Sequence, residues 1–212
     1  MENLDNLYNA ILCGNLKMAV EICREAVADG CDPQYIINEY MASAMREIGN
    51  RFETGRAFVP ELLMSARAMK GALNILKPLL AASGTDSGLG KIVIGTVKGD
   101  LHDIGKNLVA SMLEGSGFEV INLGTDISAE KFVAAVKEHQ AKIVCLSALL
   151  TTTMGYMQTI IQALEESGLR NQVKVMIGGA PISEAFARQI GADGYSENAN
   201  AAVALARSLV VC

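Results

Sequence analysis

The second half of the chain alternates short β-branched runs with helical stretches, and this alternation restricts the fold more than any other feature. The expected strands are 91–97, 119–123, 142–147, 173–177 and 194–195, and the expected helices lie near 104–114, 128–139, 154–167, 183–190 and 198–210. Strands joined by crossover helices run parallel, and the wholly apolar runs 92–94 and 143–146 indicate a sheet covered on both faces. The pattern predicts a flavodoxin-like, doubly wound α/β domain with five parallel strands.

Up to about residue 82 the apolar residues recur with a helical period instead. Gly14 follows a first helix, Asp32 and Pro33 are suited to the N-cap and first position of a third helix, and a fourth begins near Pro60. Four helices with short connections predict an antiparallel bundle. Residues 83–90 are small, polar and glycine-rich, which is typical of a flexible linker. We therefore expect a helical domain at 1–82, a linker at 83–90 and an α/β domain at 91–212.

Composition narrows the possible functions. The 212 residues carry a net charge of −5, which argues against a nucleic-acid or anionic-membrane partner. The longest apolar runs are far shorter than the ~20 residues of a membrane helix. The N-terminus is acidic and polar, unlike a secretory signal, so we expect a cytoplasmic protein. The five cysteines form no C-x-x-C pair and there are only two histidines, so a zinc site is not expected.

In a doubly wound sheet, ligands bind beyond the carboxyl ends of the strands. One of the two histidines, His102, follows the first strand with Asp100 two residues before it. A carboxylate of this kind orients a metal-binding imidazole, and Gly105 allows something bulky to approach the backbone. The alternative interpretation is a helix-capping aspartate beside an ordinary loop histidine. A metal bound here would need its other ligands from a non-protein source.

Three motifs at these strand ends resemble one family. Asp100-x-His102-x-x-Gly105, then Ser147-x-Leu149, then a Gly-Gly pair at 178–179 are similar to the cobalamin-binding domain shared by methionine synthase and the corrinoid methyltransferase proteins. Residues 52–69 resemble the helical cap that covers the cofactor in that family. The resemblance spans nearly the whole chain and implies a B12-binding domain behind a four-helix cap.

The resemblance implies a cobalamin (corrinoid) cofactor, in which the corrin ring supplies four nitrogens to cobalt and the protein adds one axial ligand. His102 would be this metal ligand, with Asp100 and then Thr153 as a relay behind it. Methionine synthase has serine at the place of Thr153, and threonine keeps the hydroxyl. Proton uptake by the His–Asp pair would tune the change between the methylcob(III)alamin, cob(II)alamin and cob(I)alamin states.

The resemblance also implies further cofactor contacts. Ser147 would hydrogen-bond the detached lower base of the cofactor, and Leu149, Thr151, Gly178 and Gly179 would line its slot, where glycines leave room for the tail. The remaining contacts to ring or tail would come from Gly99, Leu101, Asp103, Ile104, Gly105 and Ala199. Asp126, in contrast, is expected to cap the helix that starts at Ser128.

On the upper face of the ring, Phe52, Val59 and Leu62 match cap positions that shield the methyl group in methionine synthase, and Glu61 would face the ring edge. An apolar lid that excludes solvent prevents side reactions of a labile cobalt–carbon bond. The alternative for each apolar residue is core packing within the bundle.

The leading hypothesis is a methyl carrier that is not an enzyme on its own. Cobalt(I) would accept a methyl group from a substrate-specific methyltransferase and deliver it to a second methyltransferase, with a reductive activase as a further partner. Once cap and cofactor domain are assigned, no residues remain for a substrate barrel. The alternatives are an adenosylcobalamin-binding regulator, a mutase small subunit, or an ordinary receiver or flavodoxin. A regulator would carry a DNA-binding segment before the cap, and a receiver needs an aspartate where Ser147 stands.

Overall fold

A computed structural model describes residues 2–82 and 89–210. The chain divides into two compact units, one drawn from the ranges 1–88 and 111–117 and the other from 89–110 and 118–212. Most of the expected linker, residues 83–88, lies outside the described residues. Within the described ranges, no helix is both long and apolar enough to span a membrane.

The N-terminal unit is helical, as predicted. It contains α1 (Glu2–Leu12), α2 (Leu16–Ala28), α3 (Pro33–Tyr35), the π-helical segment η1 (Ile36–Met41), α4 (Ala42–Glu53) and α5 (Val59–Ala82). Segments α3, η1 and α4 follow one another without a break and replace the single third helix expected from the sequence. Asp32 caps this stretch as predicted, because its carboxylate accepts a hydrogen bond from the backbone N–H of Tyr35 at 3.0 Å.

The apolar faces of these helices meet in a buried core. Helix α2 packs against α1 and α5, and α4 packs against the same two helices. Leu7, Ile11 and Met69 are fully buried. Gly71 lets α2 approach α5 closely, because a Cβ there would collide with the side chain of Leu16.

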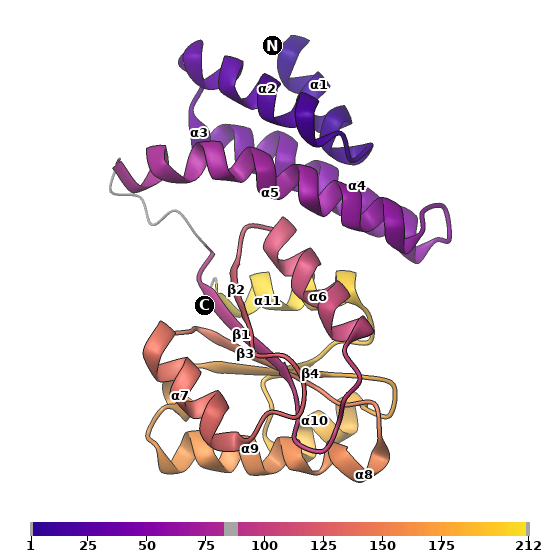
Figure 1. Ribbon diagram of the computed structural model, residues 1–212, viewed down its shortest axis with the longest axis vertical. Helices are drawn as coiled ribbons and strands as arrows, with labels where there is room; N and C mark the ends of the chain where they lie inside the picture. Colours follow the sequence, from indigo (N-terminus) through magenta and orange to yellow (C-terminus); the bar gives the residue numbers. More distant parts are fainter. Residues whose placement is uncertain (1, 83–88, 211–212) are drawn as a thin grey trace. The chain divides into compact units, whose positions relative to one another are not determined.

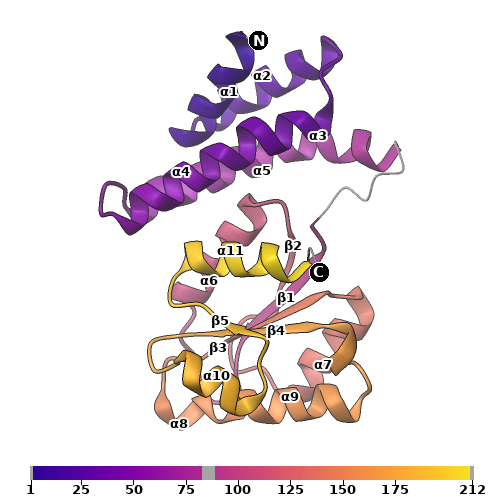
Figure 2. The same ribbon diagram turned by 180° about the vertical axis from the view of Figure 1, so that it is seen from behind.

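The C-terminal unit is the predicted doubly wound domain (Figure 1). The elements along this part of the chain are β1 (Lys91–Thr96), α6 (Ile104–Gly115), β2 (Glu119–Asn122), α7 (Ala129–His139), β3 (Ile143–Ser147), α8 (Thr151–Met154), α9 (Tyr156–Glu166), η2 (Arg170–Gln172), β4 (Lys174–Gly178), α10 (Glu184–Ile190), β5 (Gly194–Tyr195) and α11 (Ala199–Val210). The end of α6, from residue 111, is grouped with the helical unit. All neighbouring strands pair in parallel, in the order β2-β1-β3-β4-β5. Helices α6 and α11 cover one face of the sheet, and α7, α9 and α10 cover the other (Figure 1, Figure 2).

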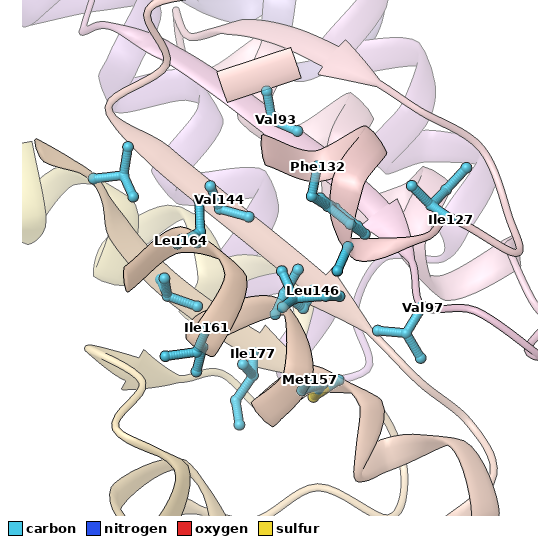
Figure 3. Close-up of a cluster of buried hydrophobic side chains, with 14 of the residues drawn as sticks. Val93, Val97, Ile127, Phe132, Val144, Leu146, Met157, Ile161, Leu164 and Ile177 are labelled. Atoms are coloured by element: carbon cyan, nitrogen blue, oxygen red, sulfur yellow. The ribbon is translucent and has the colours of Figure 1, made fainter. Parts of the chain in front are cut away.

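The sheet core is aliphatic and closely packed. On the face under α7 and α9, Val93, Val144 and Leu146 pack with Phe132 and Ile161 (Figure 3). Gly95 of β1 makes room for the ring of Phe132, since a Cβ there would come within 2.7 Å of the ring. Strands β1 and β3 are buried almost throughout, which confirms that helices cover both faces of the sheet. This rigid core fixes the strand ends, where the candidate site lies.

Candidate functional site

The three motifs found in the sequence lie at the carboxyl ends of adjacent strands. In the parallel register Thr96 at the end of β1 is paired with Ser147 at the end of β3, and Ser147 is paired with Gly178 at the end of β4. The three residues therefore form one row across the sheet. The loop that bears His102 starts from the first member of this row, and the hydroxyl of Thr96 donates to the carbonyl oxygen of His102 at 2.8 Å.

His102 and Asp100 form a close pair in this loop. Nδ1 of His102 lies 2.8 Å from Oδ1 of Asp100, and the same oxygen accepts the backbone N–H of His102 at 3.1 Å. The imidazole is 52% exposed, whereas the Asp100 side chain is fully buried. Because Nδ1 is held by the carboxylate, Nε2 is the ring nitrogen available to a metal.

The second oxygen of Asp100 connects this loop to the loop after β3. Oδ2 accepts the backbone N–H groups of Leu149 at 2.8 Å and Leu150 at 3.2 Å, and the hydroxyl of Thr153 at 2.8 Å. Burial alone would raise the pKa of Asp100, but the hydrogen bonds from Leu149, His102 and Thr153 outweigh it and hold the pKa well below its usual range. The carboxylate is therefore charged at neutral pH. The structure thus brings together all three residues of the predicted relay.

Exposed apolar side chains flank this polar group in sequence. Leu101 is 73% exposed, Ile104 is 87% exposed, and Leu149 and Leu150 are each about two-fifths exposed. Large aliphatic side chains exposed together mark a ligand or partner surface more often than a solvent-facing one.

Gly105 adds an open cradle at the same place. A Cβ built on this residue would meet no atom within 4 Å, and its φ is not in the left-handed region. Glycine is therefore not required there by the fold itself, which agrees with a space kept for a bulky group. A single imidazole nitrogen, an apolar surface and open space above a glycine fit a planar macrocycle that supplies its own metal ligands.

Gly178, the last residue of β4, and Gly179 after it are constrained by the fold, and their place in a slot for the cofactor tail stays a prediction. Gly179 has a φ of +132° and a Cβ there would collide with the carbonyl oxygen of Ala148. The fold therefore requires glycine at 179 whether or not a ligand is bound. A Cβ on Gly178 would come within 3.1 Å of the carbonyl oxygen of Ser196.

The other predicted slot and tail residues lie at the same edge. Ser147 is half-buried at the end of β3, Thr151 is exposed at the start of α8, and Ala199 is buried at the start of α11. Asp103 is exposed directly before α6. No ligand contact of these residues is tested, so their roles stay predictions.

Asp126 does not cap α7 as expected. Ser128 occupies the N-cap position of α7, and Asp126 adopts a left-handed conformation with a φ of +55°. Oδ1 of Asp126 accepts the backbone N–H of Gly99 at 2.7 Å, and its own N–H donates to the carbonyl oxygen of Asp100 at 3.0 Å. Asp126 therefore supports the loop before His102. Sequence reasoning missed this role because the partners are 27 residues apart.

The predicted cap residues lie near the end of α4 and the start of α5 in the helical unit. Phe52 is half-buried, Val59 is 39% exposed and Leu62 is fully buried. Glu61 is exposed, and its carboxylate accepts the backbone N–H of Phe58 at 2.8 Å, which caps the start of α5. Burial of Leu62 favours the alternative of core packing for this residue, whereas Val59 remains open to a ligand.

Comparison with known proteins assigns both halves of the chain. A sequence model of the B12 binding domain matches residues 90–204, and a second model, also described as a B12 binding domain, matches residues 4–77. A corrinoid protein of Desulfitobacterium hafniense is 43% identical over 212 residues, covering 99% of this chain and 98% of that protein. A dimethylamine corrinoid protein of Methanosarcina barkeri is 43% identical over 209 residues, covering 99% and 98%.

A solved structure agrees with these relatives. The methanol:cobalamin methyltransferase complex of Methanosarcina barkeri contains a chain that superposes with a TM-score of 0.83 at 30% identity, covering 99% of this chain and 80% of that chain. The match extends over the helical unit as well as the sheet. The chain therefore belongs to the B12-binding family and, over its whole length, to the corrinoid proteins of methyltransferase systems.

Proposed function

We propose that the chain is a cytoplasmic methyl carrier that binds cobalamin and is not an enzyme on its own. It would receive a methyl group from a substrate-specific methyltransferase and deliver it to a second, methyl-accepting methyltransferase, with a reductive activase as a third partner. The observation that carries this proposal is the His102–Asp100–Thr153 arrangement, in which a half-exposed imidazole is held by a buried carboxylate. The names of the relatives, corrinoid proteins of methyltransferase systems, support the same function.

The cofactor would supply a cobalt centre that takes up a methyl group in the reduced state and gives it up to a nucleophile. His102 would hold the metal through Nε2, while Leu101, Ile104 and Gly105 would support the ring. Ser147 would hydrogen-bond the displaced base. The remaining residues proposed for the slot, the tail and the upper face are Gly99, Asp103, Leu149, Thr151, Gly178, Gly179, Ala199, Phe52, Val59, Glu61 and Leu62.

The proton in this mechanism belongs to the His–Asp pair. If His102 binds a metal through Nε2, Nδ1–H would donate a hydrogen bond to Asp100, which would fix the tautomer and the orientation of the ring. If His102 were released from the metal, Nε2 would be free to accept a proton, and the buried carboxylate of Asp100 would remain beside the ring to balance the charge. Thr153 and the backbone N–H groups of Leu149 and Leu150 keep the carboxylate in place during both states.

The division into a cap at 1–82, a linker at 83–90 and a cobalamin domain at 91–212 is part of the proposal. It is supported by the composition of the linker and by the two B12-binding matches, which end at 77 and begin at 90.

The protein's two histidines permit a direct test of the metal ligand. The protein is loaded with cobalamin, reduced to cobalt(II) and examined by electron paramagnetic resonance with and without nitrogen-15 histidine. We expect the nitrogen splitting to change with the isotope. This response to histidine labelling should disappear in His102→Ala and persist in the matched control His139→Ala. A splitting that does not respond to histidine labelling would refute the proposal.

The methyl donor is tested with the reduced, loaded protein. The names of several relatives make dimethylamine and trimethylamine the first donors to examine, with methanol as a comparison. Each donor is mixed with its methyltransferase, and the loss of the cobalt(I) absorbance is followed. We expect one donor and methyltransferase pair to discharge the cobalt(I) absorbance of the wild-type protein. With His102→Ala, every pair should discharge it more slowly.

A further inference from the structure

A buried lysine lies in the first turn of α6, four residues after His102. Lys106 is 4% exposed, although burial of an amine is costly unless its hydrogen bonds are satisfied. Nζ donates to Oδ1 of Asn107 at 2.6 Å and to Oδ1 of Asn122 at 2.7 Å. Burial lowers the pKa of Lys106, and the nearby carboxylate of Asp103 opposes this shift.

The contacts of Lys106 extend in two directions. Asn122 is the last residue of β2, and its Oδ1 also accepts the backbone N–H of Gly124 at 3.1 Å. Asn122 Nδ2 donates to Oδ1 of Asn107 at 3.0 Å, and Asn107 Nδ2 donates to Oδ2 of Asp103 at 2.9 Å. Asp103 is adjacent to His102. One hydrogen-bonded network therefore runs from the end of the edge strand β2 to the residue beside the candidate metal ligand.

This network completes the support of the His102 loop. The loop is held at its start by Asp126 and in its middle by the contacts of Asp100 and Thr96. Its far end is the first turn of α6, where Lys106 lies. A methionine of similar length would fill the same space without the cost of burying an amine. The contribution of the lysine is therefore the position in which its hydrogen bonds hold Asn107 and Asn122, and not the free energy of burying its side chain.

We propose that Lys106 is a positioning residue for the corrinoid site, which fixes the first turn of α6 to the end of β2 through Asn122 and thereby holds His102 in place to bind the metal. This inference rests on the proposed function, because the position of His102 matters only if it binds cobalt. Residues that orient a metal ligand through other groups typically contribute 10- to 100-fold to metal affinity. Lys106 is linked through Asn107 to Asp103, the neighbour of His102. Because this link is indirect, we expect loss of Lys106 to lower cobalamin affinity by about tenfold.

The test compares Lys106→Met with the exposed control Lys131→Met. Both proteins are titrated with cob(II)alamin, and the histidine splitting of the bound cobalt(II) is measured by electron paramagnetic resonance. Lys106→Met is expected to bind about tenfold more weakly and to have a smaller histidine-bound fraction. Lys131→Met should match the wild type. Urea unfolding of the cofactor-free proteins identifies any variant that is not folded during the titration.

A second pair of variants tests the other end of the contact. Asn122→Asp keeps the oxygen that accepts from Lys106, and Asn122→Ala removes it. We expect Asn122→Ala to reproduce the Lys106→Met effect and Asn122→Asp to retain most of the wild-type splitting. This comparison decides the question if Lys106→Met does not fold. Lys106→Met and Asn122→Ala both remove the contact between Lys106 and Asn122, although each also removes a contact with Asn107 and Asn122→Ala removes the one with Gly124. The effects of the two single variants should therefore not add fully in the double variant.

The outcomes separate this inference from the proposed function. A wild-type protein without histidine splitting would refute the proposed function itself. A wild-type protein with the splitting, together with a folded Lys106→Met of unchanged affinity and unchanged splitting, would overturn the positioning role alone. Equal behaviour of Asn122→Ala and Asn122→Asp would also overturn it.

Discussion

Oδ1 of Asp100 lies 2.8 Å from Nδ1 of His102, and the carboxylate that makes this contact is fully buried while the imidazole is half exposed. The other oxygen of Asp100 takes hydrogen bonds from the loop after β3. One carboxylate therefore connects two loops at the edge of the sheet and orients the histidine at the same time. Changes at Asp100 should affect both the fold and the ligand.

We expect Asp100→Asn to lower the stability of the cofactor-free protein by about 1–3 kcal/mol. The amide has only one acceptor oxygen, so either the loop after β3 or His102 loses its partner. Cobalamin affinity should fall by about 10- to 100-fold. Urea unfolding and cobalamin titration measure the two effects, with the exposed Asp29→Asn as control. Unchanged values for both would contradict the role assigned to Asp100.

The low pKa of Asp100 predicts a particular acid sensitivity. A carboxyl group whose pKa is lower in the folded protein contributes stability that is fully present above its unfolded value, here 3.8, and is lost as the pH falls towards the folded value. The difference in unfolding free energy between the wild type and Asp100→Asn should therefore be constant near neutral pH and shrink below about pH 4. Urea unfolding at pH 7, 5 and 3.5 measures it. A difference that grows on acidification would reverse the assigned sign.

Thr153 should behave as a hydroxyl donor to Asp100. Thr153→Ser keeps the group that donates to Oδ2 of Asp100, whereas Thr153→Ala removes it. We expect the alanine variant to lose about 1 kcal/mol of stability and the serine variant to lose less. The effect on cobalamin affinity should be smaller than that of Asp100→Asn, because Leu149 and Leu150 still donate to the carboxylate. Equal affinities of the serine and alanine variants would remove Thr153 from the relay.

The fold was largely predictable because its determinants are local. Helical periodicity and β-branched runs placed every strand of the sheet to within a residue or two, and the apolar runs in β1 and β3 predicted burial on both faces. The π-helical segment Ile36–Met41 was not predicted, because its apolar spacing is also that of an α-helix.

The site was only partly predictable because several contacts join distant residues. The Asp100-x-His102 spacing predicted the contact between the carboxylate and the imidazole, and the resemblance predicted that Thr153 lies behind Asp100. The left-handed conformation of Asp126 and the contact between Lys106 and Asn122 depend on how β1, β2 and α6 meet in space. The role of Gly179 in the slot stays a prediction. That the fold itself also requires glycine there depends on the approach of Ala148, which is not readable from sequence.

Two glycine substitutions distinguish fold requirements from ligand space. Gly179→Ala should lose about 3 kcal/mol or more, because the left-handed region is strained for alanine and its Cβ collides with Ala148. Gly105→Ala should be neutral or more stable by up to about 1 kcal/mol without cofactor, since its Cβ meets open space in a helix. The same Gly105→Ala variant should bind cobalamin more weakly. Unchanged cobalamin affinity would show that the space at Gly105 is not used by the cofactor.

Alanine substitutions at Val59 and Leu62 should distinguish a residue that shields the cofactor from one that packs in the core of the helical unit. Leu62→Ala is expected to cost about 2–5 kcal/mol in unfolding free energy, because the side chain is fully buried. Val59→Ala should change stability by less than about 0.5 kcal/mol, because Val59 is partly exposed. If Val59 shields the upper face of the ring, its variant should show severalfold faster oxidation of the reduced, loaded protein in air, measured by absorbance. The control Val27→Ala, at a half-buried position in α2, should leave this rate unchanged, and equal rates for both valine variants would leave Val59 without a shielding role.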